Sequence, residues 1–189
     1  DEETARLYAQ ANQAAVETVA SRVKEYNIAC DFLRQAAYTY TTDAKEVEKI
    51  EAEVEAARKA GLPAEFVRSC SLPFAIEGAI RVDNQAQFHP RKYLLGLAQL
   101  VDCDGSYVWE QTHALSIEEG EPCRVTTSRG VLTADQVVIA THFPFQDSAA
   151  YFARMEPHRS YVLAITLDGP APDGMYITPD SSHTIRRQP

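Results

Sequence analysis

The stretch VLTADQVVIATHFPF, residues 131–145, sets the strongest limit on how this chain can fold. It opens polar, continues as a run of β-branched residues, and ends at Ala-Thr-His before an aromatic-proline turn. β-branched side chains favour a pleated strand, and a short apolar run bounded by turn residues is consistent with a strand buried on both faces. We therefore expect a buried strand here whose end reaches a binding site.

Two segments in the first third of the chain have helical spacing. Between Thr4 and Tyr26 one face is apolar and the other is charged, which predicts an amphipathic helix. Its expected apolar stripe is Leu7, Ala11, Ala15, Val19 and Val23. A second helix is expected after Asp43, a good N-cap with Glu46 in the capping-box position, and before Gly61. Its expected inner stripe is Val47, Ile50, Val54 and Ala57.

A third helix, RKYLLGLAQLV, is expected to begin at Pro90, and the strand pattern dominates after Gly105. Gly120 and Gly130 mark tight turns between successive strands. The segments expected as strands are 28–42, with a bulge near Arg34-Gln35, then 75–82, 106–112, 113–119, 123–128, 131–142, 159–169, 174–180 and 183–189. The fold class is therefore α+β: two or three helices on one side of a mixed, mostly antiparallel sheet, plus part of an α/β cofactor-binding domain.

The net charge of −9 argues against binding to nucleic acid or to an anionic membrane, because phosphate groups need Lys and Arg to neutralise them. The four cysteines are widely spaced without a CxxC pair, so no metal site is predicted and a reducing, cytoplasmic location is expected. The chain opens inside a helical pattern without Met, which favours a processed chain or an excised fragment.

The sequence lacks the motifs of several catalytic classes: it contains no GxGxxG, GxxxxGK[ST], GxSxG or HExxH. His89 and His142 each lie at an element boundary and could act on a ligand or simply occupy a turn. Arg and Tyr side chains on the last expected strands could hold a carboxylate, or could equally form cross-strand pairs. These residues are Arg159, Tyr161, Tyr176 and Arg186. Asp180, Ser182 and His183 are too close in sequence to form a hydrolytic triad.

Three segments resemble the FAD-dependent amine and amino-acid oxidoreductases of the D-amino-acid oxidase type, which include glycine oxidase and γ-glutamylputrescine oxidase. The segments read HPRKYLLGLAQLV, DGSYVWEQTHALSI and RGVLTADQVVIATHFPF. RSYVLA and GMYITPDSSHTIRR further resemble a subgroup with ATH-x-P in place of ATG, some members of which carry a Rieske iron–sulfur domain. The resemblance covers most of the chain and is strongest between Gln87 and Pro144.

The resemblance implies a division of the chain and a set of site residues. Residues 1–88 would form linking helices and the start of a substrate-binding domain, 89–145 part of an FAD-binding domain, and 146–189 further substrate-domain strands. The positions that would contact FAD are Ala114, Ala140, Thr141 and His142, the last standing where the wider family has glycine. The positions that would line the substrate side are Tyr161, Tyr176 and Arg186. No residue is assigned to catalysis.

The implied chemistry is hydride transfer from a C–H next to an amine nitrogen to FAD, in the complete protein, and this chain alone is expected to be inactive and not to retain the cofactor. The implied partner is a small amine or amino acid, and an isolated piece could form a homodimer. The alternative is a non-catalytic module that binds a small acid or a partner protein, because the loop that would hold the FAD pyrophosphate is missing.

Overall fold

The computed structural model describes residues 1–143, 145–146 and 150–188. Pro144 of the ATH-x-P motif and Pro189 of the last expected strand lie outside these residues. The described residues divide into two compact units: unit 1 comprises Asp1–Asp104 with Leu167–Pro189, and unit 2 comprises Gly105–Thr166. Unit 1 is therefore built from two separate stretches of sequence.

Unit 1 contains a five-stranded sheet in the order β2-β3-β1-β7-β8. β1 pairs antiparallel with β3, with an irregularity between Gln35 and Ala37, close to the bulge predicted at Arg34-Gln35. β1 also pairs with β7, and this is the parallel pair that makes the sheet mixed. The strands are β1 (Leu33–Thr41), β2 (Ala64–Val67), β3 (Gly78–Gln87), β7 (Met175–Ile177) and β8 (Thr184–Arg186). The predicted α+β class with a mostly antiparallel sheet is confirmed.

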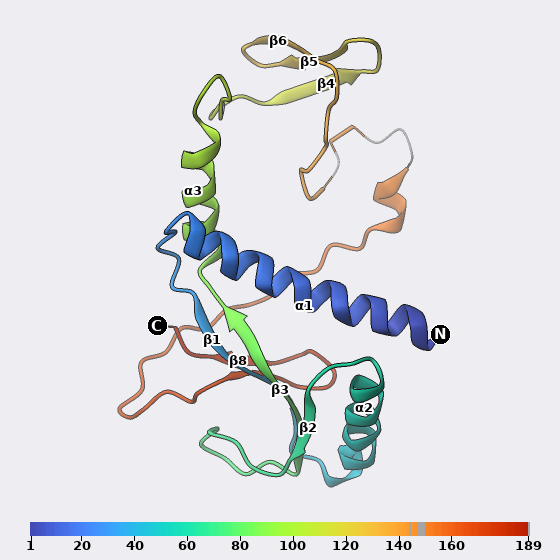
Figure 1. Ribbon diagram of the computed structural model, residues 1–189, viewed down its shortest axis with the longest axis vertical. Helices are drawn as coiled ribbons and strands as arrows, with labels where there is room; N and C mark the ends of the chain where they lie inside the picture. The colour runs from blue at the N-terminus through green and yellow to red at the C-terminus, as the bar shows by residue number, and fades with distance from the viewer. Residues whose placement is uncertain (144, 147–149, 189) are drawn as a thin grey trace. The chain divides into compact units, whose positions relative to one another are not determined.

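Each predicted helix of unit 1 forms at the expected place. They are α1 (Glu2–Glu25), α2 (Val47–Lys59), which follows the short 3-10 helix η1 (Ala44–Glu46), and α3 (Pro90–Val101). α2 lies against β2 and β3 (Figure 1). Ile50 and Val54 are its buried residues, as its predicted stripe requires. Pro90 occupies the first turn of α3, where its missing N–H costs no hydrogen bond.

The predicted stripe of α1 is wrong in its N-terminal half. Val19 and Val23 pack against the buried cluster of Ile28, Cys30 and Tyr93, but Leu7 is 58% exposed. α1 contacts the sheet from its middle onward: Gln13 accepts a hydrogen bond from Gln85 of β3 at 3.2 Å, and Glu17 forms an ion pair with Arg34 of β1 at 2.7 Å. The one buried residue of α1 among the described residues is Ala9, which the predicted stripe does not include.

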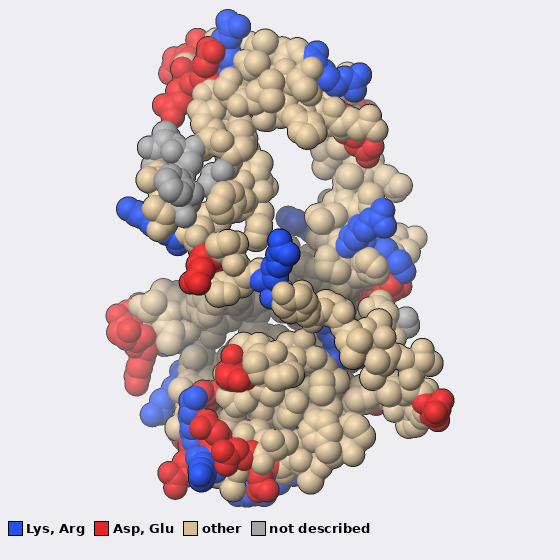
Figure 2. All heavy atoms as spheres, turned by 180° about the vertical axis from the view of Figure 1, so that it is seen from behind, with Lys and Arg blue, Asp and Glu red and all other residues tan. Residues whose placement is uncertain are grey.

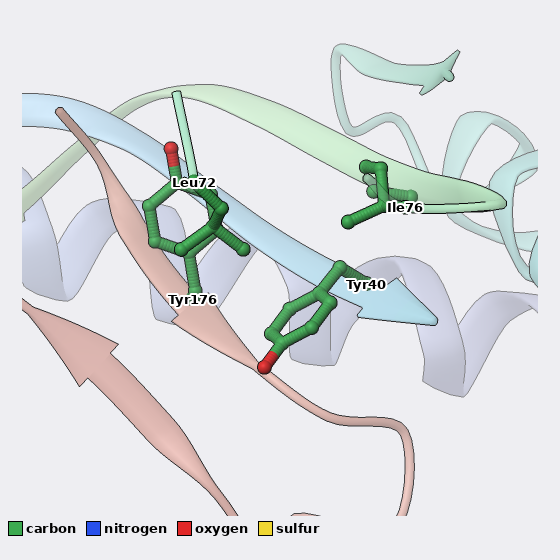
Figure 3. Close-up of a cluster of buried hydrophobic side chains, with 5 residues drawn as sticks. Tyr40, Leu72, Ile76 and Tyr176 are labelled. Carbon is green, nitrogen blue, oxygen red and sulfur yellow. The ribbon is translucent and has the colours of Figure 1, made fainter. Parts of the chain in front are cut away.

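Aromatic side chains from β1 and β7 form the centre of the second buried cluster, which comprises Tyr40, Leu72, Ile76, Ala79 and Tyr176 (Figure 3). The Tyr38 and Tyr176 rings stack with their centroids 4.8 Å apart. A Cβ atom at Gly174, which has φ +108°, would lie 2.8 Å from the Tyr38 ring. Glycine immediately before β7 therefore allows β7 to lie this close to β1.

Unit 2 contains a three-stranded antiparallel meander of β4 (Ala114–Glu118), β5 (Cys123–Thr127) and β6 (Gly130–Ala134). The turns fall at Gly120 and Gly130, as predicted from the sequence. A short 3-10 helix, η2 (Tyr151–Arg154), follows later in the unit.

Two predicted strands do not form, residues 106–112 and 159–169, and the predicted strand 131–142 ends already at Ala134. Each missing segment has the composition of a strand but belongs to neither of the two sheets of the described residues. Their apolar side chains are correspondingly exposed, with Val138 at 87% and Tyr161 at 94%. The preference of a residue for strands reflects its packing on a sheet. Such residues therefore do not form a strand where no adjacent strand is present.

The N-cap before α2 gives a direct test of local stability. The Asp43 carboxylate accepts a hydrogen bond from the Lys45 N–H at 2.9 Å and starts η1. Asp43→Ala is expected to lower the free energy of unfolding by about 1 kcal/mol. Hydrogen exchange of the α2 amides in the full-length protein measures the change. Asp43→Asn keeps the acceptor oxygen and is the control, and equal effects of the two variants would contradict the capping role.

Acidic and basic side chains are interspersed on the face shown in Figure 2 and form no continuous basic area there. Within the described ranges, no helix combines the length and the apolar character needed to cross a membrane. α1 is long enough, but it carries charged residues near both ends and at Glu17.

Candidate functional site

A cavity of about 730 Å³ in unit 1 lies between the end of β1, the start of α2 and the β7–β8 turn. We call it the hairpin cavity. Its size is typical of small-molecule sites, which usually enclose about 300–1,000 Å³. The lining residues are Tyr40, Thr41, Thr42, Asp43, Glu46, Lys49, Phe74, Thr178, Pro179, Asp180, Ser182 and His183.

The Asp180 carboxylate organises the turn between β7 and β8. One of its oxygens, Oδ1, accepts hydrogen bonds from the Thr178 hydroxyl at 2.6 Å, the Ser182 hydroxyl at 2.8 Å and the Ser182 N–H at 3.1 Å. These bonds, first that from Thr178, lower the pKa of Asp180 to about 2. Asp180 is therefore a carboxylate at any physiological pH.

Asp180, Ser182 and His183 do form a chain of hydrogen bonds, but its order excludes a hydrolytic triad. The Ser182 hydroxyl contacts both Asp180 and the Nδ1 atom of His183, which lies 2.7 Å away. A triad needs the imidazole between the carboxylate and the hydroxyl, so that it can take the hydroxyl proton. The sequence argument against a triad reaches the same result by a different route.

Tyr40 closes the inner side of the hairpin cavity. It is 6% exposed, and among the described residues no hydrogen-bond partner is found for its hydroxyl. Figure 3 shows that hydroxyl pointing toward the segment after β7, whose Thr178 and Pro179 line the same cavity. Burial, and secondarily the nearby Cys70, raises the pKa of Tyr40, so that the phenol stays neutral.

Another hollow of unit 1, of about 180 Å³, lies where β8 passes the start of α3. Its charged groups are mostly paired: Lys92 lies 2.6 Å from Asp31, and Arg187 lies 2.7 Å from Asp173. Arg186 also lines it and has no ion-pair partner within the described part of the chain. This hollow therefore carries one uncompensated positive charge, which suits a small anion.

Of the three predicted substrate residues, the two in unit 1, Tyr176 and Arg186, are not brought together. Met175 pairs with Arg186 and Tyr176 with Ile185, so the side chains of Tyr176 and Arg186 project from opposite faces of the sheet. Tyr176 is 2% exposed, and its hydroxyl bonds to the Asp173 carbonyl and, at 2.9 Å, to Ser71. Tyr161 lies in unit 2 and is exposed. Their predicted substrate contacts stay predictions.

All four positions predicted to contact FAD lie in unit 2. Ala114 begins β4, and Ala140, Thr141 and His142 lie in the irregular segment after β6. His142 has φ +65°, and the Phe143 N–H bonds to the Thr141 carbonyl at 2.7 Å across it. This three-residue turn keeps the left-handed backbone that glycine usually provides. Histidine is therefore compatible with the conformation expected there.

The segment after His142 is tied to the meander by one side chain. The Gln146 amide accepts from the Ile117 N–H at 2.5 Å and donates to the Ile117 carbonyl at 2.7 Å. It thus replaces an adjacent strand at this point of β4. Ala114 and Ala140 are exposed and small, so a ligand can reach the backbone at both. These features fit a cofactor held by backbone groups, which is the predicted role for FAD.

Sequence reasoning did not single out the hairpin cavity or its inner residue Tyr40. The signal available was the coincidence of a polar β7–β8 turn with the polar end of β1, but only the parallel β1–β7 pairing brings these together. Within the described ranges, no group of three His, Cys, Asp or Glu side chains could hold a metal ion.

Comparison with known families identifies the class of protein to which the chain belongs. The model of the DAO family, described as FAD dependent oxidoreductase, matches residues 1–188. The chain belongs to this family of FAD-dependent oxidoreductases. The resemblance inferred from its sequence motifs is confirmed.

Three relatives show where the chain falls within the family. YhfW of Bacillus subtilis (strain 168), whose name describes a Rieske 2Fe-2S iron-sulfur protein, is 40% identical over 97% of the chain and 36% of its own length. γ-Glutamylputrescine oxidoreductase of Escherichia coli (strain K12) is 25% identical over 73% of the chain and 34% of its own length. Glycine oxidase from Geobacillus kaustophilus shares the fold, with a TM-score of 0.57 and 20% identity over 71% of the chain and 38% of its own. The chain thus spans little more than a third of each relative.

Proposed function

We propose that the full-length protein oxidises an amine or an amino acid, with FAD as the acceptor of a hydride from the carbon next to the nitrogen. The observation that carries this proposal is the family match over residues 1–188. The names of the relatives, an amine oxidoreductase and an amino-acid oxidase, support the substrate class. FAD supplies the oxidising power when bound, while the protein binds and orients the substrate.

In this proposal unit 2 binds the cofactor and unit 1 binds the substrate. Unit 2 holds the cofactor through its backbone at Ala114 and along Ala140–His142, where side chains are small or the backbone is left-handed. Unit 1 supplies the substrate side, and the unpaired guanidinium of Arg186 holds a substrate carboxylate. A planar guanidinium suits this role because it can bind both carboxylate oxygens.

The test is a reduction experiment on the purified full-length protein. We expect it to contain flavin, and we expect the flavin absorbance to bleach when an amine or amino acid is added without oxygen. The matched hydroxy acids, which lack the nitrogen, serve as controls and should leave the spectrum unchanged. A protein that binds no flavin would overturn the proposal, and a flavoprotein reduced only by hydroxy acids would overturn the substrate class.

The similarity to YhfW favours a Rieske cluster, rather than molecular oxygen, as the acceptor of the electrons. We propose that the full-length protein carries a Rieske cluster that receives electrons from the reduced flavin. The support is the 40% identity over 97% of the chain. Iron and sulfide analysis, with electron paramagnetic resonance of the reduced protein, tests this. Stoichiometric flavin without iron would show that the acceptor lies elsewhere.

A further inference from the structure

The sheet by itself holds the end of β8 weakly. β8 consists of Thr184–Arg186 and lies at the edge of the sheet, where β7 is its neighbour. A strand of this length is at the short limit, and an edge strand is hydrogen-bonded to other strands on one side alone. Arg186 is the last residue of β8 and is exposed. Packing therefore does not fix its side chain, and the place that the guanidinium can reach depends on where the backbone after β8 lies.

Two glutamine side chains from the middle of the sheet hold the open end of the β7–β8 hairpin. Gln87 of β3 donates a hydrogen bond from Nε2 to the Arg187 carbonyl, which directly follows β8, at 2.9 Å. Gln35 of β1 accepts one at Oε1 from the Gly174 N–H, which directly precedes β7, at 3.2 Å. β3 and β8 are not neighbours in the sheet, so the bond from Gln87 is separate from the strand pairing.

Both carboxamide groups use only half of their hydrogen-bonding capacity. Gln35 Nε2 and Gln87 Oε1 are buried and have no partner among the described residues. A buried donor or acceptor that stays unpaired destabilises a fold, and a side chain of similar shape without polar atoms avoids this cost. The stability of the sheet therefore does not account for glutamine at these two positions, whereas a role in placing the end of the hairpin does.

We propose that Gln87, together with Gln35, is a positioning residue for Arg186. By holding the carbonyl of the next residue, Gln87 keeps the Arg186 guanidinium at the hollow that both residues line. A guanidinium binds a carboxylate best through two parallel hydrogen bonds, and this geometry requires a fixed anchor for the side chain. The inference rests on the proposed function, in which Arg186 holds the substrate carboxylate. Gln87 acts through Arg186 and is given no contact with the substrate.

The kinetic test is Gln87→Met in the full-length protein, because methionine keeps the approximate shape and removes both polar atoms. The KM for an amino acid is expected to rise about threefold. The kcat, and the KM for an amine without a carboxylate, are expected to stay unchanged. Hydrogen exchange of the β1 and β3 amides should show no loss of stability, because the unpaired buried acceptor is removed. A merely structural role would instead lower stability and affect both substrates alike.

The control for this substitution lies on the same strand. Gln85 donates to Gln13 of α1 at 3.2 Å and has no bond to the hairpin, so Gln85→Met should leave both KM values unchanged. Because Gln87 acts through Arg186, adding Gln87→Met to Arg186→Ala should raise KM no further. If Gln87→Met raised KM equally with and without Arg186, the positioning role would be wrong.

A second measurement does not depend on turnover or on flavin. 2,3-Butanedione modifies accessible arginines, and fragment mass spectrometry of the peptide that contains Arg186 and Arg187 gives the rate at each residue. Acetate is expected to slow the modification of Arg186 in the wild-type protein, and chloride at the same ionic strength is the control. Arg187, which is paired with Asp173 at 2.7 Å, serves as the internal reference. The protection of Arg186 by acetate is expected to be lost in Gln87→Met and retained in Gln85→Met.

Each outcome of the protection experiment decides between the two proposals. Loss of protection in Gln87→Met alone supports the positioning role. Equal protection in the wild type and Gln87→Met overturns that role and leaves the carboxylate role of Arg186 intact. Absence of protection in the wild type overturns both roles, while the reduction of flavin by amines or amino acids still tests the oxidation by itself.

Discussion

Replacing Ile50 with alanine is expected to lower the free energy of unfolding of unit 1 by about 2–5 kcal/mol, the usual cost of truncating a buried isoleucine. Ile50 is 0% exposed and lies on the face of α2 that contacts β2 and β3. The truncation removes apolar contacts and leaves a cavity that a helix packed on a sheet cannot readily close. Native-state hydrogen exchange with mass spectrometry measures the loss directly in the peptides of β2, β3 and α2.

Two controls make the Ile50 result specific. Ile50→Val removes a single carbon and is expected to cost about 0.5–1.5 kcal/mol. Glu53→Ala changes an exposed residue of the same helix and is expected to stay within about 0.5 kcal/mol of the wild type. If Ile50→Ala behaved like Glu53→Ala, α2 would not pack on the sheet as described.

Replacing Arg186 with alanine is expected to raise the KM of the full-length enzyme for an amino-acid substrate by roughly tenfold. Arg186 is exposed in this chain, so the expected cost is that of losing hydrogen bonds to a charged group, roughly 1.5–3 kcal/mol, and about 1.4 kcal/mol corresponds to tenfold. The expectation rests on the position of Arg186 beside Gln87 and on its lack of an ion-pair partner among the described residues. Steady-state kinetics with and without a substrate carboxylate give the comparison.

The neighbouring arginine provides the control for Arg186. Arg187 forms an ion pair with Asp173 at 2.7 Å, so Arg187→Ala should affect local stability more than KM. Arg186→Lys keeps the charge but loses the planar fork and should recover only part of the affinity. An amine without a carboxylate should be insensitive to both changes. Unchanged KM in Arg186→Ala would remove this residue from the substrate site.

The sequence predicts the helices and strands of this chain correctly where residues close together in sequence determine them. Pro90 and the apolar spacing of Ile50 and Val54 mark helices that form as predicted. The meander is predicted because Gly120 and Gly130 separate segments that pair with each other locally. The predicted strands around Val138 and Tyr161 do not form, and both side chains are exposed. A strand needs an adjacent strand to pair with, and the strand preference of its own residues does not provide one.

The candidate site is less predictable than the fold. His142 and Arg186 can be selected from the sequence because family motifs mark their positions, but the side chains around a cavity come from distant segments. Tyr40 and Asp180 lie 140 positions apart and line the same cavity because β7 pairs with β1. A single tyrosine in a strand pattern carries no sign that its hydroxyl lacks a partner.

The interrupted sequence of unit 1 has a consequence for biosynthesis. β1 and β7 are separated by the whole of unit 2, so a ribosome must translate past Ile177 before β1 gains its parallel neighbour. At about 5–20 residues per second, that edge of β1 stays open on the order of 10 s. Open strand edges are templates for aggregation. Unit 2, whose strand pairings are all local, can fold during this interval, while the nascent sheet of unit 1 becomes a substrate for chaperones that act on the emerging chain.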